Sequence, residues 1–244
     1  MIKTELCAYS VEACQIAARL GVNRVELCAS PAEGGVTPSL ASIERVAQIP
    51  NLDLSVMIRP RGGDFLYSDD EFQTMLLDIE YARKAGATGV VFGILTADGK
   101  VDVERTRQLV EAAGDMETTF HRAVDMAEDY TQAVEDIIAA GCKRILTSGS
   151  YDKAIDGIEN IAKAVEVSRG RIEIMAGSGV VAKNAQQLAA TGVDALHFSA
   201  KCMVSGGMLY RNPRISMGGS DAVDEFALRT VDENEVKEIL KLIK

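Results

Sequence analysis

Two hydrophobic patterns alternate along the whole chain. Short runs rich in β-branched residues, typical of strands, are each followed by a longer segment in which apolar residues recur at the spacing of an amphipathic helix. The pattern therefore predicts eight strand–helix units. The predicted strands are Ile2–Ala8, Arg24–Cys28, Leu52–Arg59, Gly89–Leu95, Glu117–Arg122, Arg144–Ser148, Arg171–Ala176 and Ala195–Ala200.

The boundaries of the predicted helices carry specific signals. Ser68 and Glu71 have the spacing of a capping box, and an apolar helical face begins at Phe72. Thr37 is followed by Pro38, which suits the first turn of a helix. Several helices are expected to end at a glycine shortly before the next strand, at Gly21, Gly86, Gly114, Gly141 and Gly192.

Eight consecutive units in 244 residues match the size and element order of an α/β fold, the closed (β/α)8 barrel. A doubly wound open sheet is the alternative, but no unit is long enough to suggest the long crossover of a switch point. No linker rich in Pro, Gly or Ser divides residues 1–244, so we expect one domain. Residues 201–220 lack periodicity and predict a long loop, either a lid or binding loop or a flexible crossing over the barrel mouth.

Alternation along the strands assigns polar residues to one face. In a barrel one strand face packs under the helices and the other fills the interior. The predicted interior positions are Glu5, Cys7, Glu26, Cys28, Met57, Arg59, Thr119, His121, Met175, His197 and Ser199. Buried charges are costly unless they are paired. The pattern therefore predicts a polar pocket near the C-terminal mouth or, alternatively, an ion-pair network without chemistry in which Arg59 pairs with Glu5 or Glu26.

Composition narrows the classes of partner. The net charge is -10, which argues against nucleic acid or an anionic membrane as the main partner, because both need a basic face. The apolar stretches are far shorter than the roughly 20 residues of a membrane helix, and we see no signal peptide. The five cysteines are an odd number without a CxxC pair, so we expect a reducing, cytoplasmic location.

Glycine-rich loops follow several predicted strands and suggest an anion site at the mouth. Gly177 and Gly179 precede a helix start, where backbone N–H groups can converge on a phosphate. Positive charge is available from Arg59, Arg61 and Lys201. A small anionic molecule would therefore fit this end of the barrel despite the acidic total charge.

His121, at the end of the fifth predicted strand, is a candidate for proton transfer because histidine titrates near neutral pH. Its partner carboxylate is expected to be Glu5, Glu26 or Asp125. The alternative is a hydrogen-bonded core histidine. His197 is expected to have a structural role or to orient a ligand.

Cys7 and Cys28 are the candidate metal ligands. They occupy equivalent places at the ends of consecutive strands, and two adjacent thiolates are soft ligands that suit Cu(I). The alternative is that both pack as small apolar residues. The spacing of His and Cys in the chain predicts no zinc site, and Cys14 and Cys142 are poor ligand candidates.

Several long motifs resemble those of the CutC family of copper homeostasis proteins, in order and over essentially the whole chain. They are Arg24–Cys28, Glu33–Ser39, Ile58–Phe65, Thr119–Asp125, Leu146–Gly149 and Met175–Val180. The resemblance implies a cytoplasmic TIM barrel that forms a homo-oligomer, with a dimer favoured, and that is linked to copper handling. It also implies Cys7 and Cys28 as Cu(I) ligands.

Two functional hypotheses follow. The first is a copper homeostasis protein that binds Cu(I) through Cys7 and Cys28. The second is a barrel enzyme of lyase or isomerase type that acts on a small anionic or phosphorylated metabolite, with Glu5, Glu26 and His121 as acid–base groups. Its substrate-binding residues would be Arg59, Arg61, Asp64, Arg122, Asp125, Ser148, Gly177, Gly179 and His197. No organic cofactor is indicated.

Overall fold

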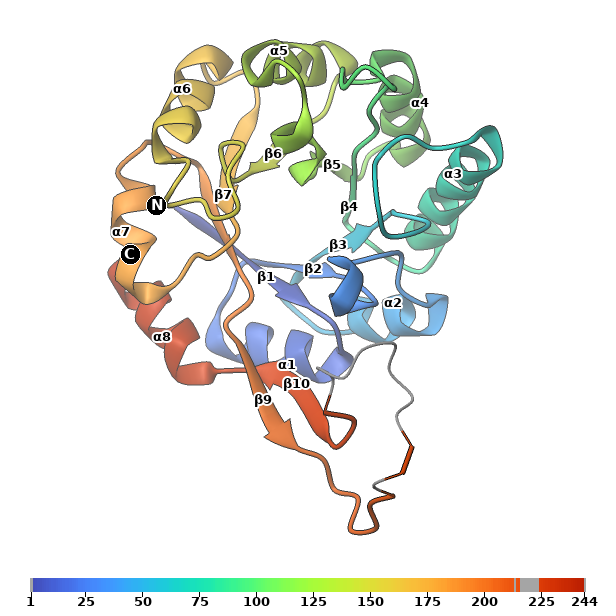
Figure 1. Cartoon of the computed structure of the whole chain (residues 1–244), viewed down its shortest axis with the longest axis vertical. Coiled ribbons are helices and arrows are strands. Elements are labelled where there is room, and N and C mark those ends of the chain that lie inside the picture. Colours follow the sequence, from blue (N-terminus) through green and yellow to red (C-terminus); the bar gives the residue numbers. More distant parts are fainter. Residues whose placement is uncertain (1, 213, 216–223, 244) are drawn as a thin grey trace.

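Eight parallel strands close into a barrel in the computed structural model, which describes residues 2–212, 214–215 and 224–243 (Figure 1). The sheet runs in chain order from β1 to β8, and β1 pairs with β8, so the barrel is predicted correctly and the open sheet is excluded. The strands are β1 (Lys3–Ala8), β2 (Arg24–Leu27), β3 (Asp53–Met57), β4 (Gly89–Phe92), β5 (Glu117–Phe120), β6 (Arg144–Thr147), β7 (Glu173–Gly177) and β8 (Ala195–Phe198).

Helices surround the barrel (Figure 1). They are α1 (Val11–Leu20), α2 (Leu40–Ala47), α3 (Asp69–Lys84), α4 (Val103–Ala113), α5 (Tyr130–Ala140), α6 (Ile158–Ser168), α7 (Ala182–Ala189) and α8 (Glu233–Leu242), with the short 3-10 turns η1 (Pro31–Glu33) and η2 (Arg122–Met126). The expected capping box at Ser68 and Glu71 starts α3. Among the described helices, none has the length and apolar character needed to cross a bilayer.

The core has the two layers that the alternation predicts. Apolar strand residues such as Leu6, Val25 and Phe120 belong to the large cluster between the strands and the helices. Inside the barrel lie two smaller groups, one formed by Cys28, Met57 and Val91 with Cys7 and Tyr9 against it, and the other formed by Leu146, Met175 and Ala195. The barrel interior is therefore apolar in patches, and its remaining positions carry charge.

Buried ion pairs join neighbouring strands inside the barrel. Arg144 on β6 lies opposite Glu173 on β7 and pairs with it, and it also donates a hydrogen bond of 2.9 Å to Oγ1 of Thr119. Glu173 also lies 3.1 Å from Nζ of Lys3. Each of these charges has a partner, which is the condition under which a charge is tolerated in an interior.

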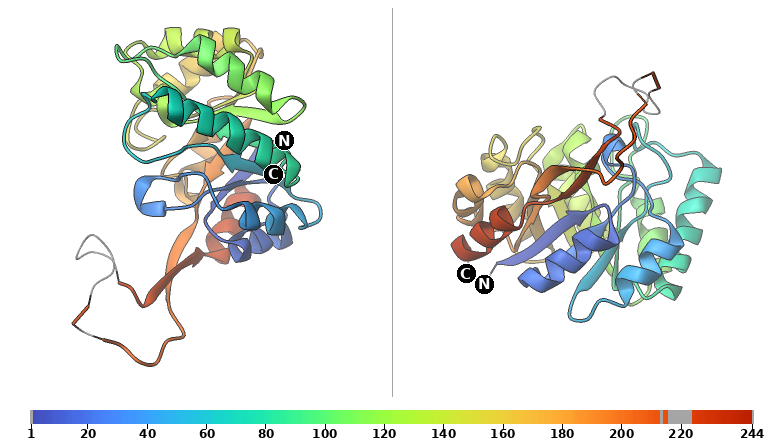
Figure 2. Two further views of the ribbon diagram at one scale, coloured as in Figure 1. Left: turned by 90° about the vertical axis from the view of Figure 1, so that its right-hand side faces the viewer. Right: turned by 90° about the horizontal axis from the view of Figure 1, so that it is seen from below.

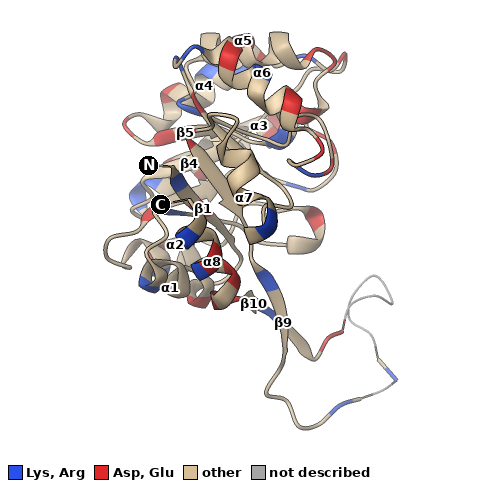
Figure 3. Cartoon of the chain, turned by 90° about the vertical axis from the view of Figure 1, so that its left-hand side faces the viewer, with Lys and Arg blue, Asp and Glu red and all other residues tan. Residues whose placement is uncertain are grey.

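The segment that we expected to be an irregular loop begins as a strand. β9 (Lys201–Ser205) pairs with β10 (Ala227–Val231) in an antiparallel ribbon, and the ribbon and residues 206–212 project away from the barrel (Figures 2 and 3). Positions 213 and 216–220 of the expected loop lie outside the described residues. β9 is largely exposed on both faces, so it lacks the alternation that identifies a strand from sequence. We call residues 201–212, 214–215 and 224–231 the arm.

The connection between β6 and α6 depends on a close approach of two glycines. Gly149 has a φ of +70°, and a Cβ on Gly157 would lie 2.1 Å from the carbonyl oxygen of Ser148. Backbone atoms therefore meet where no side chain fits. This contact fixes the turn that carries Lys153 at the barrel mouth.

We expect Gly157→Ala to lower the free energy of unfolding by about 3 kcal/mol, because the new methyl group overlaps backbone that cannot move without opening the turn. Gly207→Ala is the matched control, since a Cβ at Gly207 meets nothing within 4 Å. Urea denaturation of both variants tests the contact, and equal stabilities of the two would contradict it.

Candidate functional site

Polar side chains from β1, β2 and β8 form one connected network inside the barrel. The carboxylate of Glu5 is completely buried. It accepts a hydrogen bond from Nε of Arg24, and its other oxygen lies 2.8 Å from Nδ1 of His197. Arg24 also reaches Glu173, at 3.3 Å. Glu5 is thus held between two cationic groups, while Arg24 links this network to the ion pairs of β6 and β7.

The strand register explains why these residues meet. Glu5 lies opposite Arg24 across β1–β2 and opposite His197 across β1–β8. Cys7 lies opposite Glu26. The two Glu-Leu-Cys segments of β1 and β2 are therefore offset by two residues, in keeping with the stagger of a closed barrel. The offset places the thiol of the first segment beside the carboxyl group of the second.

The network ends in a cluster of possible metal donors. Nε2 of His197 lies 3.6 Å from Oε2 of Glu26, and Sγ of Cys28 donates a hydrogen bond of 3.6 Å to the same oxygen. Donor atoms of Cys7, Glu26 and His197 all lie within 4.8 Å of one another. Cys28 joins this group through its contacts with Glu26 and with Cys7. The cluster therefore includes both cysteines that the sequence singles out.

Two groups of the network carry full charges at neutral pH. Burial alone would raise the pKa of Glu5, but the hydrogen bond from His197 and the charge of Arg24 outweigh it and lower that pKa to about 2. Burial alone would lower the pKa of His197, but the neighbouring Glu26, Cys7 and Glu5 raise it well above its ordinary value. Glu5 is therefore an anion and His197 a cation.

The two cysteines differ in protonation. The hydrogen bond from the Cys28 thiol lowers the pKa of Cys7 well below its usual value, and the nearby His197 lowers it further. The same hydrogen bond, together with burial, raises the pKa of Cys28. Burial and its anionic neighbours raise the pKa of Glu26. Cys7 is thus the more acidic of the two cysteines, and Cys28 and Glu26 hold their protons more tightly than usual.

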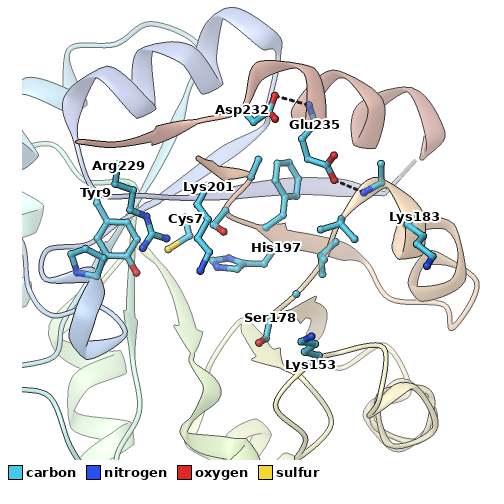
Figure 4. A pocket seen from close by; sticks show the side chains of 18 of the residues that line it. Cys7, Tyr9, Lys153, Ser178, Lys183, His197, Lys201, Arg229, Asp232 and Glu235 are labelled. Carbon is cyan, nitrogen blue, oxygen red and sulfur yellow. Dashed lines mark hydrogen bonds between the residues drawn. The ribbon is translucent and has the colours of Figure 1, made fainter. Parts of the chain in front are cut away.

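A pocket of about 1070 Å³ opens above this cluster (Figure 4). Cys7, Tyr9 and His197 line it, and the other lining residues come from the loops after β6 and β7, from the arm and from α8. The guanidinium of Arg229 lies 4.5 Å above the centre of the Tyr9 ring. A ligand in the pocket would therefore reach the sulfur of Cys7 and the imidazole of His197.

His121 lies elsewhere. Its Nδ1 accepts a hydrogen bond of 3.2 Å from the backbone N–H of Ala123, and its ring packs against Phe65 at a centroid distance of 4.9 Å. Burial and the charge of Arg59 lower its pKa to about 3, so it stays neutral near pH 7. Among the described residues it has no hydrogen bond or ion pair with Glu5 or Glu26. The expected acid–base set is thus not assembled, and the alternative of a core histidine fits the structure better.

Arg59 and Arg61 organise loops. Arg59 donates hydrogen bonds to the carbonyl oxygens of Glu33, Gly35 and Gly63, at 2.7, 3.0 and 2.8 Å. The ion-pair alternative predicts that Arg59 pairs with Glu5 or Glu26. In the structure it is Arg24 that pairs with Glu5.

Arg61 is anchored in a similar way. It pairs with Glu71 at 2.6 Å and with Asp64 at 3.1 Å, and it also donates to loop carbonyl groups. Arg59, Arg61 and Asp64 are absent from the described lining of the pocket, so they hold the β3–α3 connection in shape instead of facing a ligand there.

Arg122, Asp125 and Ser148 form a second loop clamp. Asp125 accepts hydrogen bonds from Oγ1 of Thr147 and from the N–H and hydroxyl groups of Ser148. Arg122 pairs with Asp125 at 3.0 Å and donates to Ser148 at 2.7 Å. Of the three expected binding residues only Arg122 lines the pocket.

The expected phosphate cradle is built differently. Gly177 packs inside the barrel, where a Cβ would lie 2.5 Å from Leu146 and 3.1 Å from His197, whereas Gly179 lines the pocket. The N–H of Ala182 at the start of α7 donates a hydrogen bond of 2.7 Å to a carboxylate oxygen of Glu235. A side chain therefore already occupies the position at which a phosphate would meet this helix.

Arg24 is the main site residue that the sequence analysis overlooks. Arg24, Glu26 and Cys28 are spaced by two residues, so they share one face of the strand, and this pattern could have assigned Arg24 to the interior. Tyr9, Lys153, Lys183 and Arg229 also line the pocket. They come from loops, from a helix and from the arm, where no periodicity points to a shared cavity.

Replacing Glu5 by Gln removes the charge that balances Arg24 and His197. We expect the free energy of unfolding at pH 7 to fall by about 3–5 kcal/mol, because the remaining buried charge loses its partner. The pKa of Glu5 falls from 4.5 to about 2 on folding, so its contribution is complete above pH 4.5 and is lost as the pH falls toward 2. Urea denaturation between pH 7 and 2 measures both effects, and the variant should show the weaker acid dependence.

Glu80→Gln serves as the control for this experiment. Glu80 pairs with Lys84 on the exposed face of α3, where solvent screens the attraction, so little change is expected. Similar losses of stability at pH 7 in the two variants would show that the buried network does not carry the stabilisation we assign to it.

Comparisons with known proteins agree with this architecture. A curated protein of Bacteroides fragilis with the name CutC is 46% identical over 241 residues, which cover 98% of this chain and 96% of that protein. The human copper homeostasis protein cutC homolog is 40% identical over 98% of this chain and 88% of its own length.

Solved structures extend the comparison to the fold. One from Streptococcus agalactiae that carries the CutC name matches with a TM-score of 0.78 and 37% identity, and the match covers 82% of this chain and 99% of the other. An aldolase named QR15 shares the fold at a TM-score of 0.63 and 17% identity, covering 81% of this chain and 89% of its own. The model of the CutC family matches residues 2–202, which include all eight strands of the barrel. The chain therefore belongs to the CutC family.

Proposed function

We propose that the protein binds Cu(I) through Cys7 and Cys28, with His197 as a third ligand, and that it acts in copper homeostasis. The observation that carries the proposal is the contact between the two cysteines beside His197, at the floor of an open pocket. Both thiols must stay reduced to bind the ion, so we also propose a reducing, cytoplasmic location.

The chemistry of these donors suits a soft monovalent ion. Thiolate sulfur and imidazole nitrogen are ligands that Cu(I) accepts, and the lowered pKa of Cys7 favours its thiolate form. Glu5 holds Nδ1 of His197, which leaves Nε2 facing the cluster. A carboxylate that fixes one ring nitrogen while the other binds metal is a common supporting arrangement in metal sites.

Access and protonation shape how the ion would bind. Cys7 is half-buried and lines the pocket, whereas Cys28 is buried behind it, so the ion would meet Cys7 first. Cys28 and His197 each carry a proton before binding, because their pKa values are raised. Coordination by both groups releases these protons, so the affinity for Cu(I) should increase with pH.

We expect one Cu(I) ion per chain in an anaerobic competition titration with a chromophoric Cu(I) chelator. Cys7→Ser and Cys28→Ser should each weaken binding by about a hundredfold or more, because a hydroxyl group is a poor ligand for a soft ion. His197→Gln should weaken binding less than either cysteine variant.

Cys142→Ser is the control for the loss of a buried thiol, since Cys142 packs in the outer core away from the cluster. Its Cu(I) affinity should equal that of the wild type. An unchanged affinity in the Cys7→Ser, Cys28→Ser double variant would remove the proposed site.

The arm supports a further proposal about assembly, namely that two copies of the chain form a dimer through it. Leu209 is 99% exposed, and it has apolar neighbours that also face solvent. They are Met203, Met208, Tyr210, Ile215 and Leu228. A projecting arm with this many exposed apolar side chains is typical of an interaction surface. Its described cations outnumber its acids, whereas the whole chain is acidic, so a second copy offers complementary charge.

Light scattering coupled to size-exclusion chromatography should give the mass of a dimer for the wild type. The double variant Leu209→Asp, Tyr210→Asp should run as a monomer, because two buried carboxylates oppose the contact. Leu77→Asp on α3, at an exposed position of the barrel, should remain a dimer. A monomeric wild type would refute the assembly.

A further inference from the structure

We infer that the pocket above Cys7 and His197 is a binding site for a small polyanion, a metabolite that carries phosphate or several carboxylate groups. The inference starts from four of the five Lys and Arg side chains that line the pocket, since the fifth, Arg122, is paired with Asp125. They are Lys153 in the β6–α6 connection, Lys183 on α7, Lys201 on β9 and Arg229 on β10. Within the described part of the chain, none of these four side chains has a hydrogen bond or an ion pair. The inference does not depend on copper binding.

The acidic residues of the pocket do not neutralise these cations. Asp232 accepts hydrogen bonds from the first turn of α8, and Glu235 accepts one from the start of α7. Figure 4 shows both at the α8 side of the pocket, away from Cys7. Asp152 and Glu238 are the other acids on the described lining. Lys201 and Arg229 therefore lie at the end of the pocket nearest to Cys7, apart from Asp232 and Glu235, in a protein whose net charge is -10.

Two of the cations are held in place by packing. Arg229 lies over the Tyr9 ring, a contact that orients its guanidinium and leaves its N–H groups free for an anion. Lys153 passes close to Gly179, where a Cβ would lie 3.1 Å from its Cγ. Gly179 therefore serves the pocket by leaving room for Lys153. In Figure 4, Lys201 and Arg229 lie on the side of Cys7, and Lys153 lies beside Ser178.

The size of the pocket indicates a metabolite in preference to a single inorganic ion. Its volume of about 1070 Å³ is at the upper end of the range for small-molecule sites. Because Glu235 already caps α7, the anion would be held by side chains and not by the helix N-terminus that many barrels use. Several separated cations around one large pocket favour a ligand with two or more negative charges.

Isothermal titration of metal-free protein with pyrophosphate and with citrate, at constant ionic strength against chloride, tests the inference. We expect saturable binding of at least one of the two, and which one binds tells phosphate chemistry from carboxylate chemistry. Lys153→Met, Lys201→Met and Arg229→Met should each weaken that binding about tenfold or more, as expected when a charged hydrogen-bond donor is lost.

Lys163→Met, an exposed lysine on α6, is the matched control and should bind as the wild type does. Circular dichroism verifies that each variant is folded. The Cys28→Ser variant, whose thiol does not line the pocket, should lose Cu(I) binding but keep its anion affinity, so the two proposals are tested separately. Heats no larger than those of chloride for both anions would overturn the inference, and so would wild-type affinity in all three pocket variants.

Discussion

The burial of one carboxylate, Glu5, is the constraint on which the rest of the site depends. A charge in a closed barrel must be paired, and the strand register supplies Arg24 on one side and His197 on the other. Glu5 therefore keeps His197 protonated and fixes the direction of its ring. A protonated His197 in turn favours the thiolate form of Cys7. The ion pair deeper in the barrel thus adds to the hydrogen bond of Cys28 in lowering the pKa of the Cys7 thiol.

The arginines of the barrel interior and those of the loops have different roles. Arg24 and Arg144 neutralise interior carboxylates, while Arg59, Arg61 and Arg122 bind loop carbonyl groups and carboxylates. The loop arginines are therefore engaged in shaping the mouth. The cations that remain without partners in the described pocket are mostly lysines, whose flexible side chains can adapt to a ligand.

Much of this could be predicted from the sequence. Helical periodicity and glycine stops predict the eight units, and alternation correctly places Glu5, Cys7, Glu26 and Cys28 in the barrel interior. Alternation cannot determine which interior residues meet, because pairing depends on the stagger between strands. From the sequence, Arg59 after the third strand and Arg24 at the start of the second are equally plausible partners for Glu5. The strand register places only Arg24 opposite Glu5. The strands of the arm could not be predicted for another reason, because a strand exposed on both faces has no alternation of apolar and polar residues.

Charge balance connects the interior cluster with the pocket above it. In the metal-free site Arg24 and His197 flank the charge of Glu5, and His197 also favours the thiolate form of Cys7. If Cu(I) takes both cysteines and the imidazole, the site gains one positive charge and loses two protons, so it becomes more negative by one unit. Lys201 and Arg229 line the pocket next to that change. Their positive charge would stabilise the more negative, Cu(I)-bound form of the site. When no Cu(I) is bound, the same charge would attract an anion into the pocket. The two proposed sites are therefore coupled through electrostatics, although different residues form each of them.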